Sequence, residues 1–403
     1  MLKEIVVLGS DLAALSFLKW FRASDVRAEV TIITDSEQLG VPRRCLPWVA
    51  CGLESPNDVP HFSLDAAELV FLSKVYRADP AKAAVERGSL KLDDEKLEPS
   101  VVVVSTGTQP RRDVARLARV SALNIKEAIQ AREYIESWEG EVYVYGGFYG
   151  LNMVDPLEGI GLTPVICSPV DPFEEVFDSD VALYARRVVG ELKIVEPVSA
   201  PKGQGIVFGL EEPRLPRGLV EGPYRDLEVN RNILVIGGAS TVKTPLGLLW
   251  GIDDELAYKE GLVAALRLLR QRLPLPPPFK IARVRGYVLA SCGARFSELS
   301  QSSDNITSIK ISIKEGGDRV GLIKLVASRT AQTIVGFQVV VPMQMEATVQ
   351  NLLALLALKA PIELLFLIPK YTGGWEIGEI CEALWRKMYL KPILHRVPNS
   401  LED

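Results

Sequence analysis

The sequence has 403 residues, of which 48% are hydrophobic, 7% aromatic and 24% charged, enough material for two or three hydrophobic cores. The net charge of -5 and the scattered basic residues argue against a nucleic-acid-binding surface, so we expect no nucleic-acid partner. Five cysteines without a C-x-x-C pair and only two histidines argue against a disulfide scaffold, a metal site and a histidine-based triad.

The N-terminus has no signal-peptide layout, and the best candidate for a membrane span is residues 349–368. Lys359, Pro361 and Glu363 interrupt that run, which favours two buried helices over a span. We therefore expect a cytoplasmic protein that does not cross a membrane.

The first forty residues predict a strand, a helix and a second strand. Residues 5–8 and 29–34 are short apolar runs, and residues 12–21 between them have the pattern of a helix. Continuous apolar strands joined by a helix are typical of a parallel sheet covered on both faces.

The turn after the first strand resembles a dinucleotide-binding turn, G-x-G-x-x-G/A. Gly9 and Ala14 stand at its first and third positions, which serve the tight turn and the helix packing. Asp11 stands at the second position, where backbone should approach a pyrophosphate. We expect that carboxylate to repel the phosphates by like charge.

The next hundred residues predict a loop, a helix–strand pair and a hairpin. Residues 40–52 have a loop-like pattern with prolines on both sides of Cys45. Residues 62–78 indicate a helix and then a strand, and residues 89–104 a hairpin with Asp93 and Asp94 at its turn. Its last strand, residues 101–104, ends in Ser105-Thr106-Gly107.

A second nucleotide-type unit begins with a strand at residues 141–145 and the glycine-rich turn Gly146-Gly147-Phe148-Tyr149-Gly150. Its helix should be short because Pro156 and Gly159 follow. Residues 162–167 predict a strand and residues 177–192 an amphipathic helix. Residues 196–231, rich in proline and glycine, predict a linker with little regular structure.

The last part predicts a buried strand at residues 232–238, a long helix at 254–269 and a boundary at the prolines of 274–278. Alternating strands and helices beyond that boundary, including a helix at 376–388, predict an α+β domain with an antiparallel sheet. The expected class is α/β with two Rossmann-like domains, one nested in the other, plus this α+β domain. The expected domains are residues 1–112 with 231–272, residues 113–230, and residues 279–403.

This order resembles the pyridine nucleotide-disulfide oxidoreductases, and within them the coenzyme A-disulfide reductase and NADH oxidase branch. The resemblance covers nearly the whole chain. Its landmarks are Val6-Val7-Leu8-Gly9, Leu46-Pro47-Trp48, the run at 101–107, the run at 146–153, Phe177-Asp178, the run at 232–238, Ile323-Lys324-Leu325, Ile334-Val335-Gly336 and Tyr371.

The resemblance implies FAD and NAD(P)H as cofactors. For FAD it implies Gly9, Ala14, Thr106, Gly107 and Gly237, with an acidic residue at the end of the second strand for the ribose. Thr34 stands there, and Asp35 follows one position later, where it serves FAD only if the strand ends early. The family's final G-D is Gly237-Gly238 here.

The family's redox cysteine falls on Arg44, and Cys45 comes one residue later. Arg43 and Arg44 would favour a Cys45 thiolate, and Cys51 would complete a dithiol; the alternative is that both are inert packing residues. In the second turn, the resemblance implies Gly146, Gly147 and Gly150 for NAD(P)H. Tyr149 either stacks on a nicotinamide-like ring or packs in the core.

Two functions remain open. One is an FAD-dependent NAD(P)H oxidoreductase whose motifs have diverged, acting on a disulfide, polysulfide, oxygen or quinone. The other is a non-catalytic relative that has lost FAD and acts as a binding or assembly subunit, which four joint departures favour: Asp11, Thr34, Arg44 and Gly238. The leucine-rich C-terminal helices predict a homodimer, or a heterodimer with a related subunit.

Overall fold

The structure is a computed structural model. It describes residues 3–24, 26–86, 89–93, 95–201, 203–224, 227–244, 247–250, 253–300, 305–315, 318–362, 384, 386 and 387. The chain forms two compact units, one made of Met1–Val170 and Leu192–Pro276, the other of Asp171–Glu191 and Pro277–Asp403. The expected three-domain boundaries stay a prediction, but the segment Asp171–Glu191 packs with the C-terminal residues.

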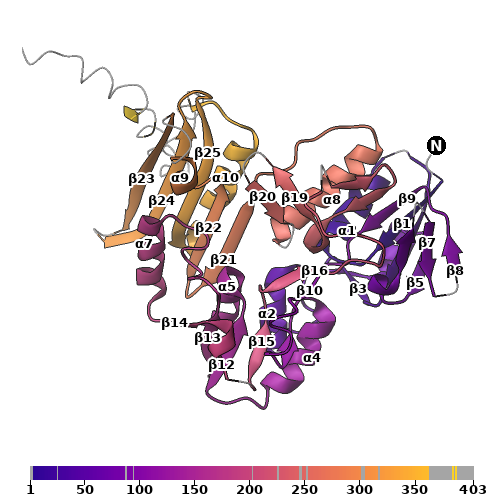
Figure 1. The fold of residues 1–403 in the computed structure, drawn as a ribbon, viewed down its shortest axis with the longest axis horizontal. Helices are drawn as coiled ribbons and strands as arrows, with labels where there is room; N and C mark the ends of the chain where they lie inside the picture. The colour runs from indigo at the N-terminus through magenta and orange to yellow at the C-terminus, as the bar shows by residue number, and fades with distance from the viewer. Residues whose placement is uncertain are drawn as a thin grey trace, which may run out of the picture. The chain divides into compact units, whose positions relative to one another are not determined.

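The first unit is built on a six-stranded sheet in the order β17-β18-β9-β1-β2-β5 (Figure 1). Strands β1 (Glu4–Leu8), β2 (Glu29–Thr34), β5 (Lys74–Arg77), β9 (Val101–Val104) and β18 (Ile233–Val235) run parallel, and β17 (Glu228–Asn230) is antiparallel to β18. All four residues of β9 are buried, which confirms the parallel sheet covered on both faces.

One face of this sheet carries α1 (Leu12–Arg22) and α8 (Asp254–Leu268), which pack against each other (Figure 1). The approach is close because Gly261 on α8 has no side chain: a Cβ there would lie 2.2 Å from the Ala13 carbonyl oxygen. The Ser16 hydroxyl donates to the Tyr258 carbonyl oxygen at 2.6 Å, which fixes the two helices in register.

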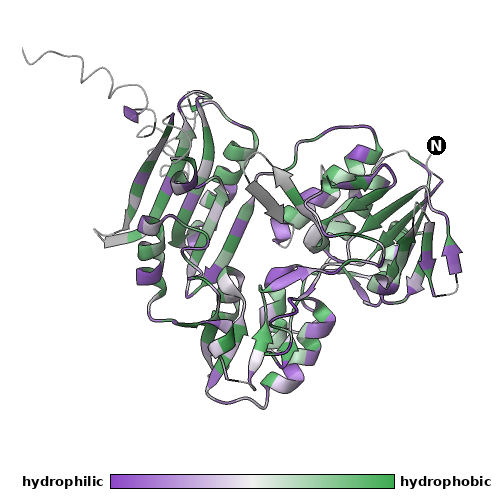
Figure 2. Ribbon diagram, in the orientation of Figure 1, coloured by the Kyte–Doolittle hydropathy of each residue, from purple (hydrophilic) through white to green (hydrophobic). Residues whose placement is uncertain are grey.

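A three-stranded sheet of β6 (Ala84–Glu86), β7 (Ser89–Leu92) and β8 (Glu95–Leu97) shares a core with the other face. Val6 and Leu8 of β1 pack there with Val85 and Leu90, since alternate residues of a strand point to opposite faces. Figure 2 shows the hydrophobic colour concentrated along these central strands. The antiparallel pairing of β7 with β8 confirms the predicted hairpin, although Asp94 of its turn lies outside the described residues; the strand at 101–104, β9, belongs to the six-stranded sheet instead.

A second, five-stranded parallel sheet in the same unit has the order β11-β15-β12-β13-β14. Its strands are β11 (Val120–Ser121), β12 (Glu141–Tyr145), β13 (Thr163–Cys167), β14 (Lys193–Val195) and β15 (Gly205–Val207). The helical segments are α4 (Ile125–Ile135), α5 (Gly147–Gly150), η3 (Leu151–Met153) and α6 (Val154–Gly159). The helix after β12 ends at Gly159, as predicted.

Two sequence-based predictions in this unit were wrong. Residues 40–52 are largely helical, with η1 (Arg43–Cys45) and α2 (Leu46–Ala50), because Pro47 sits in the first turn of α2, where no helical N–H is needed. The region 196–231 contains β15, a strand in the interior of the second sheet, whose three residues Gly-Ile-Val were too few to reveal a period.

The second unit contains a five-stranded sheet in the order β21-β22-β25-β24-β23, whose strands pair antiparallel, as predicted for this domain. Lys324 on this sheet makes ion pairs of 2.8 Å with both Asp178 and Asp180. These two ion pairs hold the start of α7 (Ser179–Val189) against the sheet. Gln338 donates to Asp178 at 2.9 Å. These buried contacts explain why α7 belongs to this unit. Its elements are β21 (Phe279–Val284), β22 (Tyr287–Gly293), α9 (Phe296–Leu299), β23 (Ile306–Glu315), β24 (Asp318–Ser328), β25 (Thr333–Pro342), η6 (Met343–Met345) and α10 (Glu346–Ala357).

The smaller elements of the first unit complete the fold. They are β3 (Gln38–Leu39), β4 (Phe62–Ser63), α3 (Leu64–Val70), η2 (Pro80–Lys82), β10 (Thr108–Pro110), η4 (Pro197–Ser199), β16 (Glu211–Pro213), η5 (Gly237–Ala239), β19 (Thr241–Thr244) and β20 (Gly247–Trp250). The predicted second leucine-rich helix, the helix at 376–388 and the landmark Tyr371 lie mostly or wholly outside the described residues.

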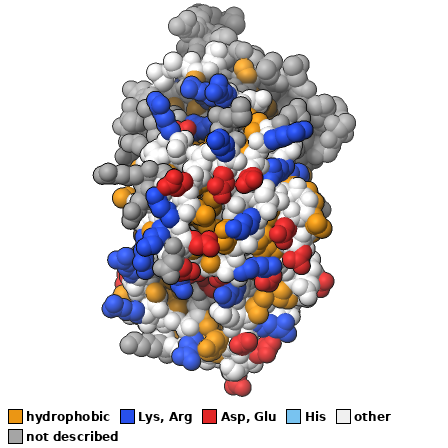
Figure 3. All heavy atoms as spheres, turned by 90° about the vertical axis from the view of Figure 1, so that its right-hand side faces the viewer, with side chains coloured by type: hydrophobic (Ala, Val, Ile, Leu, Met, Phe, Trp, Pro, Cys, Tyr) orange, Lys and Arg blue, Asp and Glu red, His pale blue; other side chains and the backbone are white. Residues whose placement is uncertain are grey.

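Within the part of the chain that the structure describes, no helix is long and apolar enough to cross a membrane. Basic and acidic side chains are interspersed on the face of the molecule in Figure 3, which shows no broad area of one sign. No group of three or more potential metal ligands occurs among the described residues.

Candidate functional site

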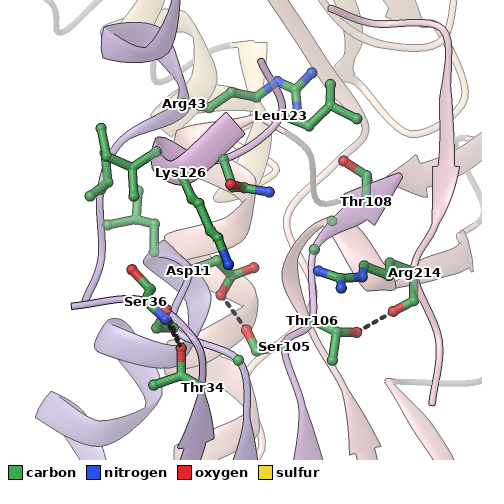
Figure 4. Close-up of a pocket in the computed structure, with 18 of the residues that line it drawn as sticks. Asp11, Thr34, Ser36, Arg43, Ser105, Thr106, Thr108, Leu123, Lys126 and Arg214 are labelled. Carbon is green, nitrogen blue, oxygen red and sulfur yellow. Dashed lines mark hydrogen bonds between the residues drawn. The ribbon is translucent and has the colours of Figure 1, made fainter. Parts of the chain in front are cut away.

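A polar cleft opens at the carboxyl ends of β1, β2 and β9 (Figure 4). The segments after these strands line it, at Gly9, Thr34 and Ser105, as expected for a parallel sheet whose strand ends share one edge. The cleft holds about 920 Å³ between its walls, including its mouth open to solvent. The first residues of α4 and α8 also line it, so three helix N-termini meet at one site.

Asp11 is the N-cap of α1. Its Oδ1 accepts hydrogen bonds from the Ala14 N–H at 3.0 Å and from the Ser105 hydroxyl (Figure 4). Burial raises the pKa of Asp11 to about 6, although bonds from Ser105 and from the backbone of Ala14, Ala13 and Gly238 act in the opposite direction. The carboxylate therefore takes up donors that a dinucleotide turn offers to phosphate.

Glu260 of α8 is a second buried acid at this turn. Its Oε2 accepts from the Gly237 N–H at 2.8 Å and from the Ser240 hydroxyl at 2.6 Å. Burial raises the pKa of Glu260 to about 8, and the charge of Asp11 adds to that increase. The group is thus mostly protonated at pH 7, and its Oε1 has no hydrogen-bond partner among the described residues.

Each basic side chain that the described residues bring to the cleft already has an acidic partner. Arg43 pairs with Glu211, Lys126 with Asp35 at 3.2 Å, and Arg214 with Asp79 at 2.8 Å. Figure 4 shows the Lys126 side chain reaching into the cleft. No basic side chain of the described lining is left without an acid to balance a phosphate charge.

The end of β2 differs from the expected ribose site. Thr34 is buried; its hydroxyl donates to Ser10 Oγ at 2.9 Å and accepts from the Ser36 N–H at 3.1 Å. Asp35 lines the cleft but is exposed and pairs with Lys126. Since β2 runs through Thr34, the strand does not end early, and Asp35 as a cofactor ligand stays a prediction.

The retained glycines serve the turns themselves. Gly9 has a φ of +101°, and a Cβ there would lie 2.0 Å from the Ser105 carbonyl oxygen. Gly237 has a φ of +66°, and its missing Cβ leaves the space that Asp11 Oδ2 occupies, 2.4 Å from where that Cβ would be. Thr106 and Gly107 line the cleft too: the Thr106 hydroxyl donates to the Arg214 carbonyl oxygen, and the Gly107 carbonyl accepts from the Arg214 N–H at 3.0 Å.

Arg43 reaches β16, which pairs with β10 in a two-stranded sheet. Its guanidinium makes a bidentate pair with Glu211, whose side chain is fully buried, and lies 4.6 Å from the Phe208 ring centroid. The Thr108 hydroxyl also donates to Glu211. Asp254 accepts from the Arg43 and Arg44 backbone N–H groups at 2.6 and 3.2 Å, and burial raises the pKa of Asp254.

The cysteine region gives little support for thiol chemistry. Arg44, at the family's cysteine position, is exposed, whereas Cys45 and Cys51 are buried cysteines that are not in a disulfide. Burial raises the pKa of Cys51 to about 12, so its thiolate is scarce at neutral pH. The helical turns between the two cysteines separate their Cα atoms by about 9 Å, beyond the reach of a disulfide unless α2 unwinds.

The second glycine-rich turn packs tightly against neighbouring backbone. A Cβ on Gly146 would lie 2.3 Å from both Gly150 Cα and the Phe208 carbonyl oxygen. Gly147 has a φ of +52° and begins α5. Tyr145 and Tyr149 are buried, in agreement with packing roles. Gly146 therefore makes close backbone contacts, and a role of Gly147 and Gly150 in binding NAD(P)H stays a prediction.

The cleft does not fit the pyrophosphate of FAD in the expected way. A pyrophosphate needs free N–H donors and unpaired cations. Here the Ala14 and Gly237 N–H groups donate to carboxyl groups, and the basic side chains are paired. No chemical step through FAD follows from this arrangement.

The sequence did not reveal Glu260, Glu211 and Asp254 as parts of the site. Glu260 and Asp254 lie on a helix that was recognised only as a long helix, and Glu211 lies in the supposed linker. An acid amid the small and apolar residues of α8 was the one available signal for Glu260, since lone acids are rarely fully buried.

Neither the protein-family models nor the curated proteins contain a match to this sequence. Solved structures do resemble it over nearly the whole chain. A NAD-dependent persulfide reductase from A. fulgidus has 16% identity and a TM-score of 0.76, covering 95% of this chain and 83% of its own. The reduced CoADR-RHD of Bacillus anthracis has 15% identity and a TM-score of 0.77, and the match covers 96% of this chain and 81% of the other. A pyridine nucleotide-disulfide family oxidoreductase from Enterococcus faecalis V583 has 14% identity and a TM-score of 0.71, and the match covers 96% of this chain and 99% of the other.

Proposed function

We propose that this chain, which has the fold of the pyridine nucleotide-disulfide oxidoreductases, is a non-catalytic binding or assembly subunit that does not use FAD. Its ancestor would have been an NAD(P)H-dependent disulfide or acceptor oxidoreductase. The fold has been kept while the groups that hold a flavin nucleotide have been replaced.

The observation that carries this proposal is that carboxyl groups of the chain itself take a donor of the first dinucleotide turn and a donor of the neighbouring η5 turn. Asp11 caps α1, and Glu260 accepts from the Gly237 N–H at 2.8 Å. A phosphate entering this turn would lie beside the ionised Asp11, in a cleft where burial weakens the screening of like charges. Such repulsion would oppose the binding of any dinucleotide.

The cysteine region supports the same proposal. A disulfide reductase needs an accessible thiolate that can attack and be attacked. Arg44 replaces the expected thiol, and Cys45 and Cys51 are both buried. Cysteine-based reduction therefore has no suitable nucleophile at the predicted position.

The second candidate function is a diverged FAD-dependent NAD(P)H oxidoreductase. The retained cleft favours it, since Thr106, Gly107 and Asp35 still line the space where the family's fold places a flavin nucleotide. In that case the acceptor would meet the flavin directly rather than through Cys45.

The absorbance spectrum of the purified protein separates the two functions. We expect a colourless protein that takes up no FAD during reconstitution, measured as unchanged flavin fluorescence anisotropy, and that does not accelerate NADH or NADPH oxidation when FAD is added. A yellow protein, or stoichiometric FAD uptake, would refute the proposal and favour the oxidoreductase.

The assembly part of the proposal concerns a homodimer or a heterodimer with a related subunit. Multi-angle light scattering at micromolar concentration should give the mass of a dimer for the full chain, or of a one-to-one complex with its partner. A monomeric mass that persists after co-purification from its source would contradict an assembly role.

A further inference from the structure

We propose that three exposed arginines of the first unit, Arg112, Arg116 and Arg119, form a docking surface for an acidic helix of a partner protein. We call these three residues the arginine stripe. The inference rests on the proposed function only in assuming that the chain acts as a binding or assembly subunit. It adds the chemistry of the partner, a helix with carboxylates repeated along one face.

The stripe lies on one face of a helical turn between β10 and β11. The Ala115 N–H donates to the Arg111 carbonyl oxygen at 2.9 Å, and the Ala118 N–H donates to the Val114 carbonyl oxygen at 3.2 Å. These bonds give residues 111–118 a helical backbone, in which residues three and four apart are neighbours on one face. The stripe has this spacing and all of it is exposed, whereas Val114 points into the core. The fold therefore turns the three guanidinium groups toward solvent together.

The positive charge of the stripe is left almost without countercharge. Asp113, the acid within the same turns, is taken by Arg111, whose Nε donates to Asp113 Oδ1 at 3.0 Å. Glu212 lies 3.8 Å from Arg112, whose side chain is 94% exposed, so this pair is weak. The rest of the stripe makes no ion pair with any residue that the structure describes. Three arginines thus present unused donors to an incoming acid.

An exposed aromatic residue borders the stripe and is the second observation that indicates a protein partner. The guanidinium carbon of Arg119 lies 5.1 Å from the ring centroid of Tyr134 on α4, and Tyr134 is 40% exposed. Stacking on a ring holds the planar guanidinium in place, so less side-chain freedom is lost when it binds. Arginine and tyrosine are the residues in which protein–protein interfaces are enriched.

Charge favours a short acidic helix over a long polyanion. The chain has 51 acidic and 46 basic residues, so a nucleic acid or a charged membrane that extends past the stripe would meet repelling carboxylates. The stripe spans about 10 Å at 1.5 Å per residue, which corresponds to two turns of a partner helix. Carboxylates on those two turns can each take two N–H donors of a guanidinium group.

The test measures how a labelled acidic peptide binds to the full-length protein, followed by fluorescence anisotropy. The peptide has about 20 residues, long enough to be helical in water, and carries Glu at i, i+4 and i+7; its analogue with Gln at those positions is the control probe. The test variant is Arg112→Glu with Arg116→Glu. The matched control, Arg231→Glu with Arg272→Glu, reverses two exposed arginines of the same unit that make no ion pair with the described residues.

We expect the wild type and the control variant to bind the Glu peptide at least about 10-fold more tightly than the Gln peptide. The test variant should lose this preference, and raising the salt concentration from about 50 to about 200 mM should weaken the wild type several-fold. If the test variant does not melt cooperatively, Arg112→Gln with Arg116→Gln takes its place, with the same expected loss.

Three outcomes would overturn the inference. The first is equal binding of the two peptides by the wild type, and the second is a preference that survives in the test variant. The third is tighter binding of a single-stranded RNA oligomer or of phosphatidylserine vesicles than of the Glu peptide, which would assign the stripe to a different class of partner.

The two proposals fail in different ways. FAD bound to the wild type refutes the proposed function and leaves the peptide result unchanged. A colourless wild type that does not distinguish the two peptides refutes only the docking surface.

Discussion

Glu260→Gln should change how the stability of the first unit depends on pH. The wild-type side chain is fully buried, and burial raises its pKa from 4.5 to about 8. The folded protein therefore keeps a proton on Glu260 that the unfolded chain releases above about pH 4.5. Its contribution to stability is fully present below that pH and is lost as the pH rises through about 8.

The magnitude follows from the two pKa values. At 1.36 kcal/mol per pKa unit, moving from 4.5 to about 8 corresponds to a stability difference on the order of 4 to 5 kcal/mol. Glutamine has the shape of the protonated acid, and its amide oxygen can still accept from the Gly237 N–H and the Ser240 hydroxyl. The variant should match the wild type near pH 4.5 and become progressively more stable than it up to about pH 9.

The assay is urea denaturation of both proteins at half-unit steps from pH 4.5 to 9, followed by far-ultraviolet circular dichroism. Subtracting the two profiles cancels every other titrating group, so the difference reports Glu260 alone. Parallel profiles over the whole range would refute a raised pKa for Glu260. As a cross-check, Asp11→Asn should lower the pH at which the wild-type profile levels off, since the Asp11 charge contributes to the shift.

Three further predictions concern packing and ion pairs. Glu211→Ala should destabilise the protein by about 3 to 5 kcal/mol in urea, because it leaves the mostly buried Arg43 guanidinium unpaired, and the double variant with Arg43→Ala should lose less. Gly261→Ala should lower the free energy of unfolding by about 1 to 3 kcal/mol, and with it the melting temperature, although alanine favours helices, because the new Cβ would lie 2.2 Å from the Ala13 carbonyl oxygen. Burial alone would raise the pKa of Asp178, but the hydrogen bonds from Lys324 and Ser297 outweigh it and lower the pKa to about 2. Stability should therefore fall by about 2 kcal/mol as the pH drops from about 4 to 2, and Asp178→Asn should abolish that part of the acid denaturation curve.

The sequence predicted those elements of the fold whose hydrophobic residues recur with a clear period. The strands at 29–34 and 141–145 agree with β2 and β12 in both bounds, since β-branched and aromatic runs between polar turns leave few alternatives. The prediction failed at α2, where two prolines suggested a loop, and at β15, where three residues carry no period. Both errors arise because tertiary packing decides the conformation of short segments.

The long-range contacts of the site were beyond the sequence. Arg43 and Glu211 are 168 positions apart, and Asp254 reaches the Arg43 N–H from 211 positions away. Their pairing depends on how η1, β16 and α8 come together in the folded unit, which no local pattern records. The acidic partners of the basic residues could therefore be found only in three dimensions.

Asp11 shows how one residue can carry two signals that lead to different conclusions. Asp11, as a replacement for a phosphate-facing glycine, was expected only to repel a ligand, although an acid directly before an apolar helix can also serve as an N-cap. The structure shows that the second role is met, with the Ala14 N–H at 3.0 Å, and that Gly237 and Ser105 accommodate the carboxylate. A capped helix no longer needs an external anion to satisfy its first N–H groups. The loss of a cofactor contact and the gain of a structural contact are thus consequences of one substitution, which explains why the turn could remain intact without a nucleotide.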